Sequence, residues 1–116
     1  MHIAEQIKRF FHGDVSLDSA TLDVYSRDAS LFEIRPTIVV FPKHVDDIKN
    51  LVRFVAEEKV KGKAISLTAR SGGTDMTGGP LSESIVVDMT RYFNHVKEVG
   101  DGYAVTEPGV YYRDFE

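Results

Sequence analysis

Two pairs of glycines in one stretch of the sequence, residues 69–84, are the strongest sign of a binding site. The pairs are Gly72-Gly73 and Gly78-Gly79. Paired glycines let the backbone approach a ligand closely and adopt positive φ angles, and successive backbone N–H groups in such turns form a concave anion site. The neighbouring side chains add hydroxyl donors and one positive charge: Ser71, Thr74, Thr77 and Arg70. These are the groups needed to hold a phosphate or a pyrophosphate.

The spacing of these glycines excludes two common phosphate-binding motifs. No Gly-Lys-Ser/Thr follows, so the stretch is not a Walker loop. The pair Gly72-Gly73 has the wrong spacing for a Rossmann fingerprint, and no helix follows on which a pyrophosphate could sit. A mobile surface loop is the alternative interpretation. Loops longer than about twelve residues inside a small domain are usually functional or disordered. Because two expected strands bound this one closely, we favour a functional loop.

The elements expected around this loop form an α/β (or α+β) fold. Residues 38–41 and 85–88 are apolar runs that predict buried strands, and residues 65–68 predict a further strand. Between residues 38 and 68, the order strand, helix, strand fits a right-handed βαβ unit. We therefore expect a small, mostly parallel sheet flanked by helices.

The helix of this unit carries an apolar stripe from Val45 to Ala56. His44 stands where Ser or Thr usually caps a helix. This replacement is expected to lower the stability of the helix by about 1 kcal/mol. The charged residues of the helix are interpreted as one solvated face: Asp46, Asp47, Lys49, Arg53, Glu57, Glu58 and Lys61. The phenylalanines, Phe32 and Phe41 among them, are expected in the core.

The two ends of the chain predict further elements. Residues 3–11 predict a helix that Gly13 ends, and residues 19–26 predict another. Residues 96–106 predict a hairpin around Gly100-Asp101-Gly102. We divide the chain into an N-terminal helical segment, residues 1–35, and a second part, residues 36–116. Since the last residues carry no stop signal, we expect that second part to be truncated.

Composition narrows the function classes. The 116 residues suffice for one domain. Fourteen Lys and Arg against eighteen Asp and Glu give a net charge of −4, which argues against nucleic-acid binding. The absence of cysteine excludes disulfides and thiolate metal sites. No apolar run reaches the length of a membrane span, and residues 1–11 lack a signal-peptide apolar block. We therefore expect a cytoplasmic protein.

Other arrangements of chemically active residues are weak. The four histidines have no metal-ligand spacing, so we expect no metal site. Ser71, Asp88 and His95 lack the Gly-x-Ser-x-Gly elbow of a hydrolase triad. Asp75 and Asp88 are the candidates for a pair of carboxylates. Asp75 is instead expected to brace the loop, and Asp88 to bind nearby backbone groups.

The stretch Thr68-Ala69-Arg70-Ser71-Gly72-Gly73-Thr74-Asp75-Met76-Thr77-Gly78-Gly79 resembles a known cofactor loop. It is similar to the pyrophosphate-binding loop of FAD-linked oxidases of the vanillyl-alcohol oxidase and p-cresol methylhydroxylase type, which commonly reads Arg-Gly-x-Gly-Thr-x-x-x-Gly-Gly after a strand. Four other pieces also resemble this family, in the same order along the chain: residues 25–30 (Tyr-x-x-Asp-x-Ser), 36–48, 85–96 and 105–110. The group that includes the glycolate oxidase flavin subunit and D-lactate dehydrogenase is the most similar.

The resemblance implies that the chain is the first lobe of a two-lobe FAD-binding domain. The backbone of Ser71, Gly72, Gly73, Thr74 and Asp75 would then hold the FAD pyrophosphate together with Thr77, Gly78 and Gly79, and Arg70 would add charge. Pro108, Gly109 and Val110 would pass near the ribityl chain or the flavin ring. Some members link a histidine to the flavin where this chain has Thr74, so the resemblance implies non-covalent FAD.

The same resemblance implies a flavoprotein oxidoreductase. It would oxidise a 2-hydroxy acid or another alcohol by hydride transfer to flavin, acting as a dehydrogenase or oxidase. The second lobe and the catalytic residues would lie beyond Glu116, so no catalytic residue is assigned. The alternatives are a nucleotide- or phosphate-binding module without redox activity, and an inactive fragment. The cell-wall precursor reductase of the same fold fits less well, because its loop is generally Gly-x-Gly-Ser-Asn.

Overall fold

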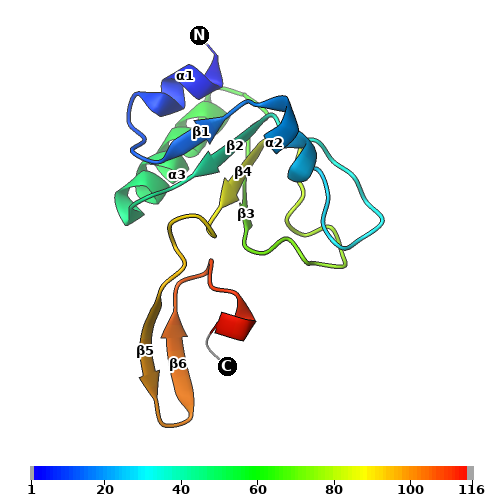
Figure 1. Cartoon of the computed structure of the whole chain (residues 1–116). Helices are drawn as coiled ribbons and strands as arrows, with labels where there is room; N and C mark the ends of the chain where they lie inside the picture. The colour runs from blue at the N-terminus through cyan, green and yellow to red at the C-terminus, as the bar shows by residue number, and fades with distance from the viewer. Residues whose placement is uncertain (1, 115–116) are drawn as a thin grey trace.

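A four-stranded sheet lies at the centre of the computed structural model, which describes residues 2–114 (Figure 1). A two-stranded hairpin extends from it. The elements in chain order are α1 (Ile3–Lys8), β1 (Asp14–Ser16), α2 (Ser19–Val24), β2 (Ile38–Phe41), α3 (Val45–Val60), β3 (Leu67–Arg70), β4 (Ile85–Asp88), β5 (Val96–Gly100), β6 (Tyr103–Thr106) and the 3₁₀ turn η1 (Tyr112–Asp114).

The sheet is mostly parallel, as the sequence predicts. Its strand order is β1-β2-β4-β3, with β2, β4 and β3 parallel and β1 antiparallel at one edge. The unit β2–α3–β3 therefore spans β4, which lies between its two strands. Every residue of β2 and β4 is buried, as expected for central parallel strands covered on both faces.

Helices cover both faces of this sheet (Figure 1). One core cluster joins α1 and α3 to β2 and β4, with Ile7, Leu51 and Ile85 at its centre. A smaller cluster on the other face joins α2 to the sheet through Leu22 and Phe41. The fold class predicted from the sequence is confirmed. Along residues 2–114, no helix is long and apolar enough to cross a membrane.

The bounds of several elements differ from expectation. The strand β1 was not predicted, because three residues paired at a sheet edge leave no periodic pattern. The strand β3 begins at Leu67 and not at Ile65, since the N–H of Ser66 donates to the Ser84 hydroxyl at 3.0 Å. The predicted loop therefore begins after Arg70, which lies inside the strand. The first helix ends at Lys8, well before Phe11.

The prediction of one solvated face on α3 is wrong at two positions. Asp47 and Glu58 are buried, whereas Val45 and Val52 are more than half exposed. Glu58 lies 2.6 Å from the Lys63 ammonium and 3.4 Å from that of Lys61. A charged residue buried in this way has partners that a helical wheel does not reveal.

The buried Asp47 carboxylate, in the first turn of α3, binds the backbone before the helix. Its carboxylate accepts the backbone N–H of His44 at 3.3 Å and that of Lys43 at 3.0 Å. It also accepts the backbone N–H groups of His12 and Gly13, at 2.8 and 3.1 Å. The carboxylate of the third helical residue thus accepts the N–H of the cap residue His44, which is the reciprocal half of a capping box.

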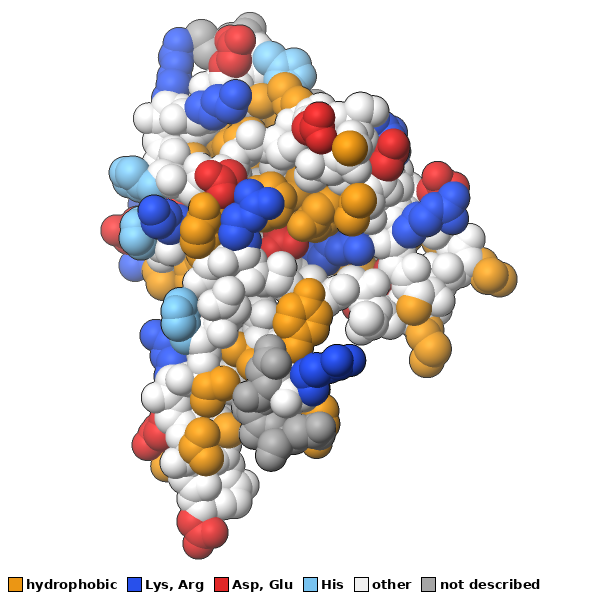
Figure 2. All heavy atoms as spheres, in the orientation of Figure 1, with side chains coloured by type: hydrophobic (Ala, Val, Ile, Leu, Met, Phe, Trp, Pro, Cys, Tyr) orange, Lys and Arg blue, Asp and Glu red, His pale blue; other side chains and the backbone are white. Residues whose placement is uncertain are grey.

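The predicted hairpin is present as β5 and β6, which pair antiparallel. Most of its residues are exposed on both faces, and Figure 2 shows apolar side chains at the surface along it. Phe32, predicted to be in the core, is 59% exposed. An isolated two-stranded hairpin is marginally stable, and the apolar side chains of this one, Val99, Tyr103 and Val105, are exposed.

Candidate functional site

The candidate site is a pocket at the carboxyl end of β3, where the glycine-rich loop begins. In open α/β sheets, ligands bind outside the carboxyl ends of the strands. The pocket has a volume of about 400 Å³. Its lining comes from four parts of the chain, namely the end of β3, the loop, the segment after β4 and the segment after β6: Ala69, Arg70, Ser71, Asp75, Gly79, Pro80, Met89 and Pro108.

Five of the predicted site residues meet in this pocket: Arg70, Ser71, Asp75, Gly79 and Pro108. Two more, Gly72 and Gly109, directly follow lining residues in the chain. A Cβ on Gly72 would be 3.1 Å from the Tyr111 ring, and the N–H of Gly109 donates to the Phe93 carbonyl at 2.7 Å. The other predicted residues are outside the lining: Gly73, Thr74, Thr77, Gly78 and Val110. The structure therefore brings the start of the loop and the Pro108 turn together, although 37 positions separate Ser71 from Pro108 (108 − 71).

Gly73 has a conformation that requires glycine. Its φ is +70°, and a Cβ built there would lie 2.3 Å from Nη2 of Arg70. The first glycine turn therefore lies directly on the arginine guanidinium. Position 73 therefore requires glycine for two reasons: the positive φ, and the lack of space for a side chain.

Arg70 is the last residue of β3 and is buried. The residue is only 9% exposed. Its guanidinium lies 4.9 Å from the centroid of the Tyr25 ring, and Nη1 donates to the Tyr25 carbonyl at 3.4 Å. Among residues 2–114, no carboxylate forms an ion pair with the Arg70 guanidinium. A buried cation without an anionic partner is costly to a fold, and this one faces a pocket.

Tyr25, whose ring lies against the Arg70 guanidinium, is itself bonded to Asp88. The Tyr25 hydroxyl donates to Oδ2 of the buried Asp88 at 2.5 Å. The other carboxylate oxygen accepts from the N–H and hydroxyl of Thr90 and from the N–H of Arg91. Burial, followed by the bond to Asp88, raises the pKa of Tyr25 well above its usual range. Asp88 therefore binds nearby backbone N–H groups, as predicted. Its hydrogen bond to the Tyr25 hydroxyl was not predicted.

The second glycine turn is held by a segment that sequence reasoning left without a role. Oδ2 of Asp28 accepts the Gly78 N–H at 2.9 Å, and the Ala29 N–H donates to the Asp75 carbonyl at 2.8 Å. The signal was in the sequence, since Asp28 belongs to the Tyr-x-x-Asp-x-Ser piece. The amide of Gly78 is thus already bonded within the chain.

His95 does not form a triad with Ser71 and Asp88. Its Nδ1 lies 2.6 Å from Oε1 of Glu107, at the base of the hairpin. This bond holds the pKa of Glu107 below its usual range. Within the described part of the chain, no three His, Asp or Glu side chains are grouped so that they could hold a metal ion.

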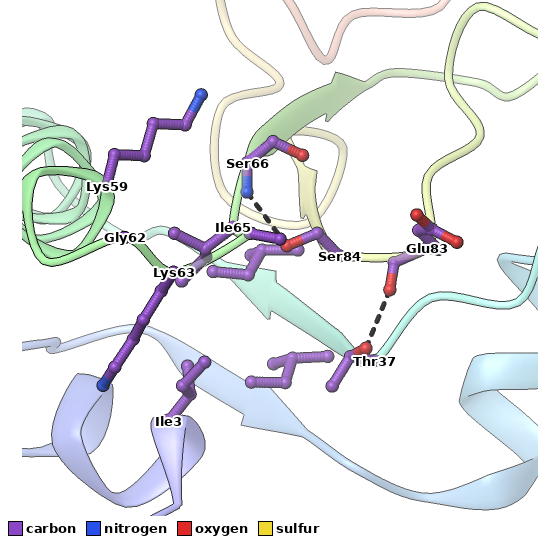
Figure 3. Close-up of a pocket in the computed structure, with 12 residues that line it drawn as sticks. Ile3, Thr37, Lys59, Gly62, Lys63, Ile65, Ser66, Glu83 and Ser84 are labelled. Atoms are coloured by element: carbon purple, nitrogen blue, oxygen red, sulfur yellow. Dashed lines mark hydrogen bonds between the residues drawn. The ribbon is translucent and has the colours of Figure 1, made fainter.

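A larger pocket, of about 680 Å³, lies at the opposite edge of the sheet, where β2 and β4 begin (Figure 3). Its polar groups are bonded within the chain: the Ser66 N–H to Ser84, and the Thr37 hydroxyl to the Glu83 carbonyl. Figure 3 shows the side chains of Lys59 and Lys63 extending in opposite directions. No positive charge converges there, so the smaller pocket is the better candidate for an anionic ligand.

The sheet, the glycine-rich crossover in place of a helix, and the buried arginine beside it define a nucleotide-cofactor-binding domain of the α/β class. A family model described as FAD binding domain matches residues 36–116. The chain belongs to this family, and its cofactor is FAD.

Solved structures of flavoenzymes share the fold. An alkyldihydroxyacetonephosphate synthase aligns with a TM-score of 0.71 over 91% of this chain and 23% of its own, at 20% identity. Physcomitrella patens BBE-like 1 aligns with a TM-score of 0.62 over 83% of this chain and 21% of its own, also at 20% identity. The resemblance to FAD-linked oxidases of the vanillyl-alcohol oxidase type is confirmed.

Two relatives in sequence carry the same name. The D-2-hydroxyglutarate dehydrogenase of Pseudomonas putida is 35% identical over 89 residues, which are 77% of this chain and 9% of the relative. That of Escherichia coli is 33% identical over 102 residues, which are 86% of this chain and 10% of the relative. The chain therefore spans about a tenth of the length of these relatives.

Proposed function

We propose that this chain is the FAD-binding part of a longer flavin-dependent dehydrogenase that oxidises a 2-hydroxy acid. The relatives named D-2-hydroxyglutarate dehydrogenase support that substrate class. When bound, FAD supplies the hydride acceptor, and the protein supplies binding, orientation and electrostatics.

Within this function, we assign the FAD pyrophosphate to the pocket at the end of β3. The observation that carries this assignment is Arg70, a buried guanidinium that lines the pocket without a carboxylate partner among the described residues. The backbone from Ser71 to Gly73 would donate N–H groups, and the positive φ of Gly73 suits such an anion-binding turn. Asp75 is the one acidic residue of the lining and is exposed, so water screens its repulsion of a phosphate.

Three finer features belong to the same proposal. Thr74, at the position where some family members have a flavin-linked histidine, leaves the FAD non-covalently bound. A second lobe of the longer protein would cover the exposed apolar side chains of the hairpin and its neighbours: Val99, Tyr103, Val105, Tyr111 and Tyr112. The location in the cytoplasm stays a prediction of the sequence.

A titration of the 116-residue chain with FAD, followed by flavin fluorescence, tests the proposal. We expect saturable binding that Gly73→Val abolishes, because the valine side chain would occupy the space of the Arg70 guanidinium. Gly62→Val is the matched control: Gly62 has a φ of +89° but no atom within 4 Å of a Cβ. The control carries the same kind of backbone strain and should still bind FAD. Equal loss in both variants, or no binding by the unaltered chain, would contradict the assignment.

A further inference from the structure

Residues 26–34, the segment after α2, form a closed loop that lies beside the glycine-rich loop (Figure 1). An isolated β-bridge joins Arg27 to Glu33, and their side chains form an ion pair at 2.8 Å. The Ile34 N–H donates to the Ser26 carbonyl at 2.9 Å. The buried Ser26 hydroxyl donates to the Leu22 carbonyl of α2 at 2.7 Å. The segment is therefore fixed to the sheet through α2.

Asp28 projects from this fixed segment onto the glycine-rich loop. One carboxylate oxygen accepts the N–H of Ser30 at 2.8 Å and also the Ser30 hydroxyl. The other accepts the N–H of Gly78 at 2.9 Å. The adjacent Ala29 N–H donates to the Asp75 carbonyl at 2.8 Å. Two hydrogen bonds, one in each direction, thus attach the second glycine turn to the segment after α2.

The geometry of Gly78 fits this attachment. Its φ is +81°, and a Cβ there would lie 3.0 Å from the Phe32 ring. Phe32 belongs to the same closed segment, so the segment contacts Gly78 both through a carboxylate and through an aromatic ring. The Phe32 ring thus lies beside Gly78 and not in the core, where it was expected.

The carboxylate of Asp28 is held in its ionised form. Partial desolvation opposes ionisation, but the side-chain bond from Ser30 and the backbone bonds from Ser30 and Gly78 lower its pKa below the usual range. Hydrogen bonds that involve an ionised acceptor are stronger than neutral ones. Asp28 is therefore a firm acceptor for the Gly78 amide at neutral pH.

We propose that Asp28 is a positioning residue for cofactor binding, which holds the Asp75–Gly78 turn in its FAD-binding shape before the cofactor arrives. This inference rests on the proposed function, in which the same loop holds the pyrophosphate. A loop ordered in advance loses less conformational entropy when its ligand binds, so its affinity is higher. Without Asp28, residues 71–84 would lose more conformational entropy when FAD binds, and the affinity for FAD would be lower.

Two measurements on Asp28→Ala test the proposal: amide hydrogen exchange without FAD, and FAD titration. We expect the Gly78 amide to exchange at least tenfold faster and FAD to bind about tenfold more weakly. Asp28→Asn keeps one carbonyl acceptor, so it should restore part of the protection of the Gly78 amide and part of the FAD affinity. Asp101→Ala is the matched control, because Asp101 is an exposed carboxylate in the turn between β5 and β6. It should leave Gly78 exchange and FAD affinity unchanged.

The two readouts separate this inference from the proposed function. Unchanged Gly78 exchange in Asp28→Ala shows that the carboxylate does not hold the turn, whatever FAD does. Faster exchange with unchanged FAD affinity shows that the turn is held but that its order does not serve the cofactor. If the unaltered chain does not bind FAD, the proposed function fails and the cofactor role of Asp28 fails with it, while the exchange result still decides the attachment.

Discussion

Replacing Asp47 with alanine is expected to lower the free energy of unfolding by about 3–5 kcal/mol, because four backbone N–H groups lose their acceptor. The side chain is fully buried. Its two oxygens join the turn after α1, at His12 and Gly13, to the turn after β2, at Lys43 and His44. The loss would be a large part of the stability of a domain this size, which is commonly about 5–15 kcal/mol. Urea unfolding at neutral pH measures it.

The dependence on pH gives the same prediction a second test. Desolvation opposes ionisation of Asp47, but the backbone N–H groups of His12, Lys43 and His44 hold its pKa below the usual range. A depressed folded-state pKa contributes stability that is fully present above the unfolded-state pKa, near 4, and is lost as the pH falls below it. The difference between Asp47→Ala and the unaltered chain should therefore narrow below about pH 4. The control is Asp46→Asn, at the exposed neighbouring position. A loss no larger than that of the control would contradict the role of Asp47.

Asp47 also shows what sequence reasoning could and could not predict. Apolar runs such as residues 38–41 and 85–88 predict buried strands, because a continuous apolar stretch needs cover on both faces. Those strands, the helix between them and the hairpin were predicted correctly. The partners of a buried carboxylate were not, since Asp47 bonds a turn 35 positions earlier in the chain (47 − 12). Local periodicity contains no information about such contacts.

The candidate site divides in a similar way. The glycine pairs and the loop length indicated an anion-binding turn, because backbone conformation is specified locally. The surroundings of Arg70 depend on Tyr25, 45 positions earlier, and on the start of β3 at Leu67. A strand predicted two residues too early placed this arginine outside the sheet, at the mouth of the loop. Its burial follows only once β3 is seen to include it.

Replacing Arg70 with methionine should weaken FAD binding about ten- to a hundredfold, because a desolvated charge contact to the cofactor is lost. The same variant should leave the free energy of unfolding unchanged or raise it by up to about 1 kcal/mol, since it replaces a buried cation that has no carboxylate partner with an apolar side chain of similar length. Weaker FAD binding without a loss of stability distinguishes a binding residue from a structural one. FAD titration and urea unfolding of the same protein measure them.

Two further variants complete this test. Arg70→Lys keeps the charge without the planar guanidinium, so it should retain more affinity than the methionine variant. Arg53→Met removes an exposed arginine of α3 and should change neither quantity. Loss of stability in Arg70→Met beyond about 1–2 kcal/mol would mean that the contact with Tyr25 supports the fold. Full FAD affinity in that variant would place the pyrophosphate away from Arg70. Reduced affinity in a protein that is at least as stable is the result that a cofactor site built around this arginine requires.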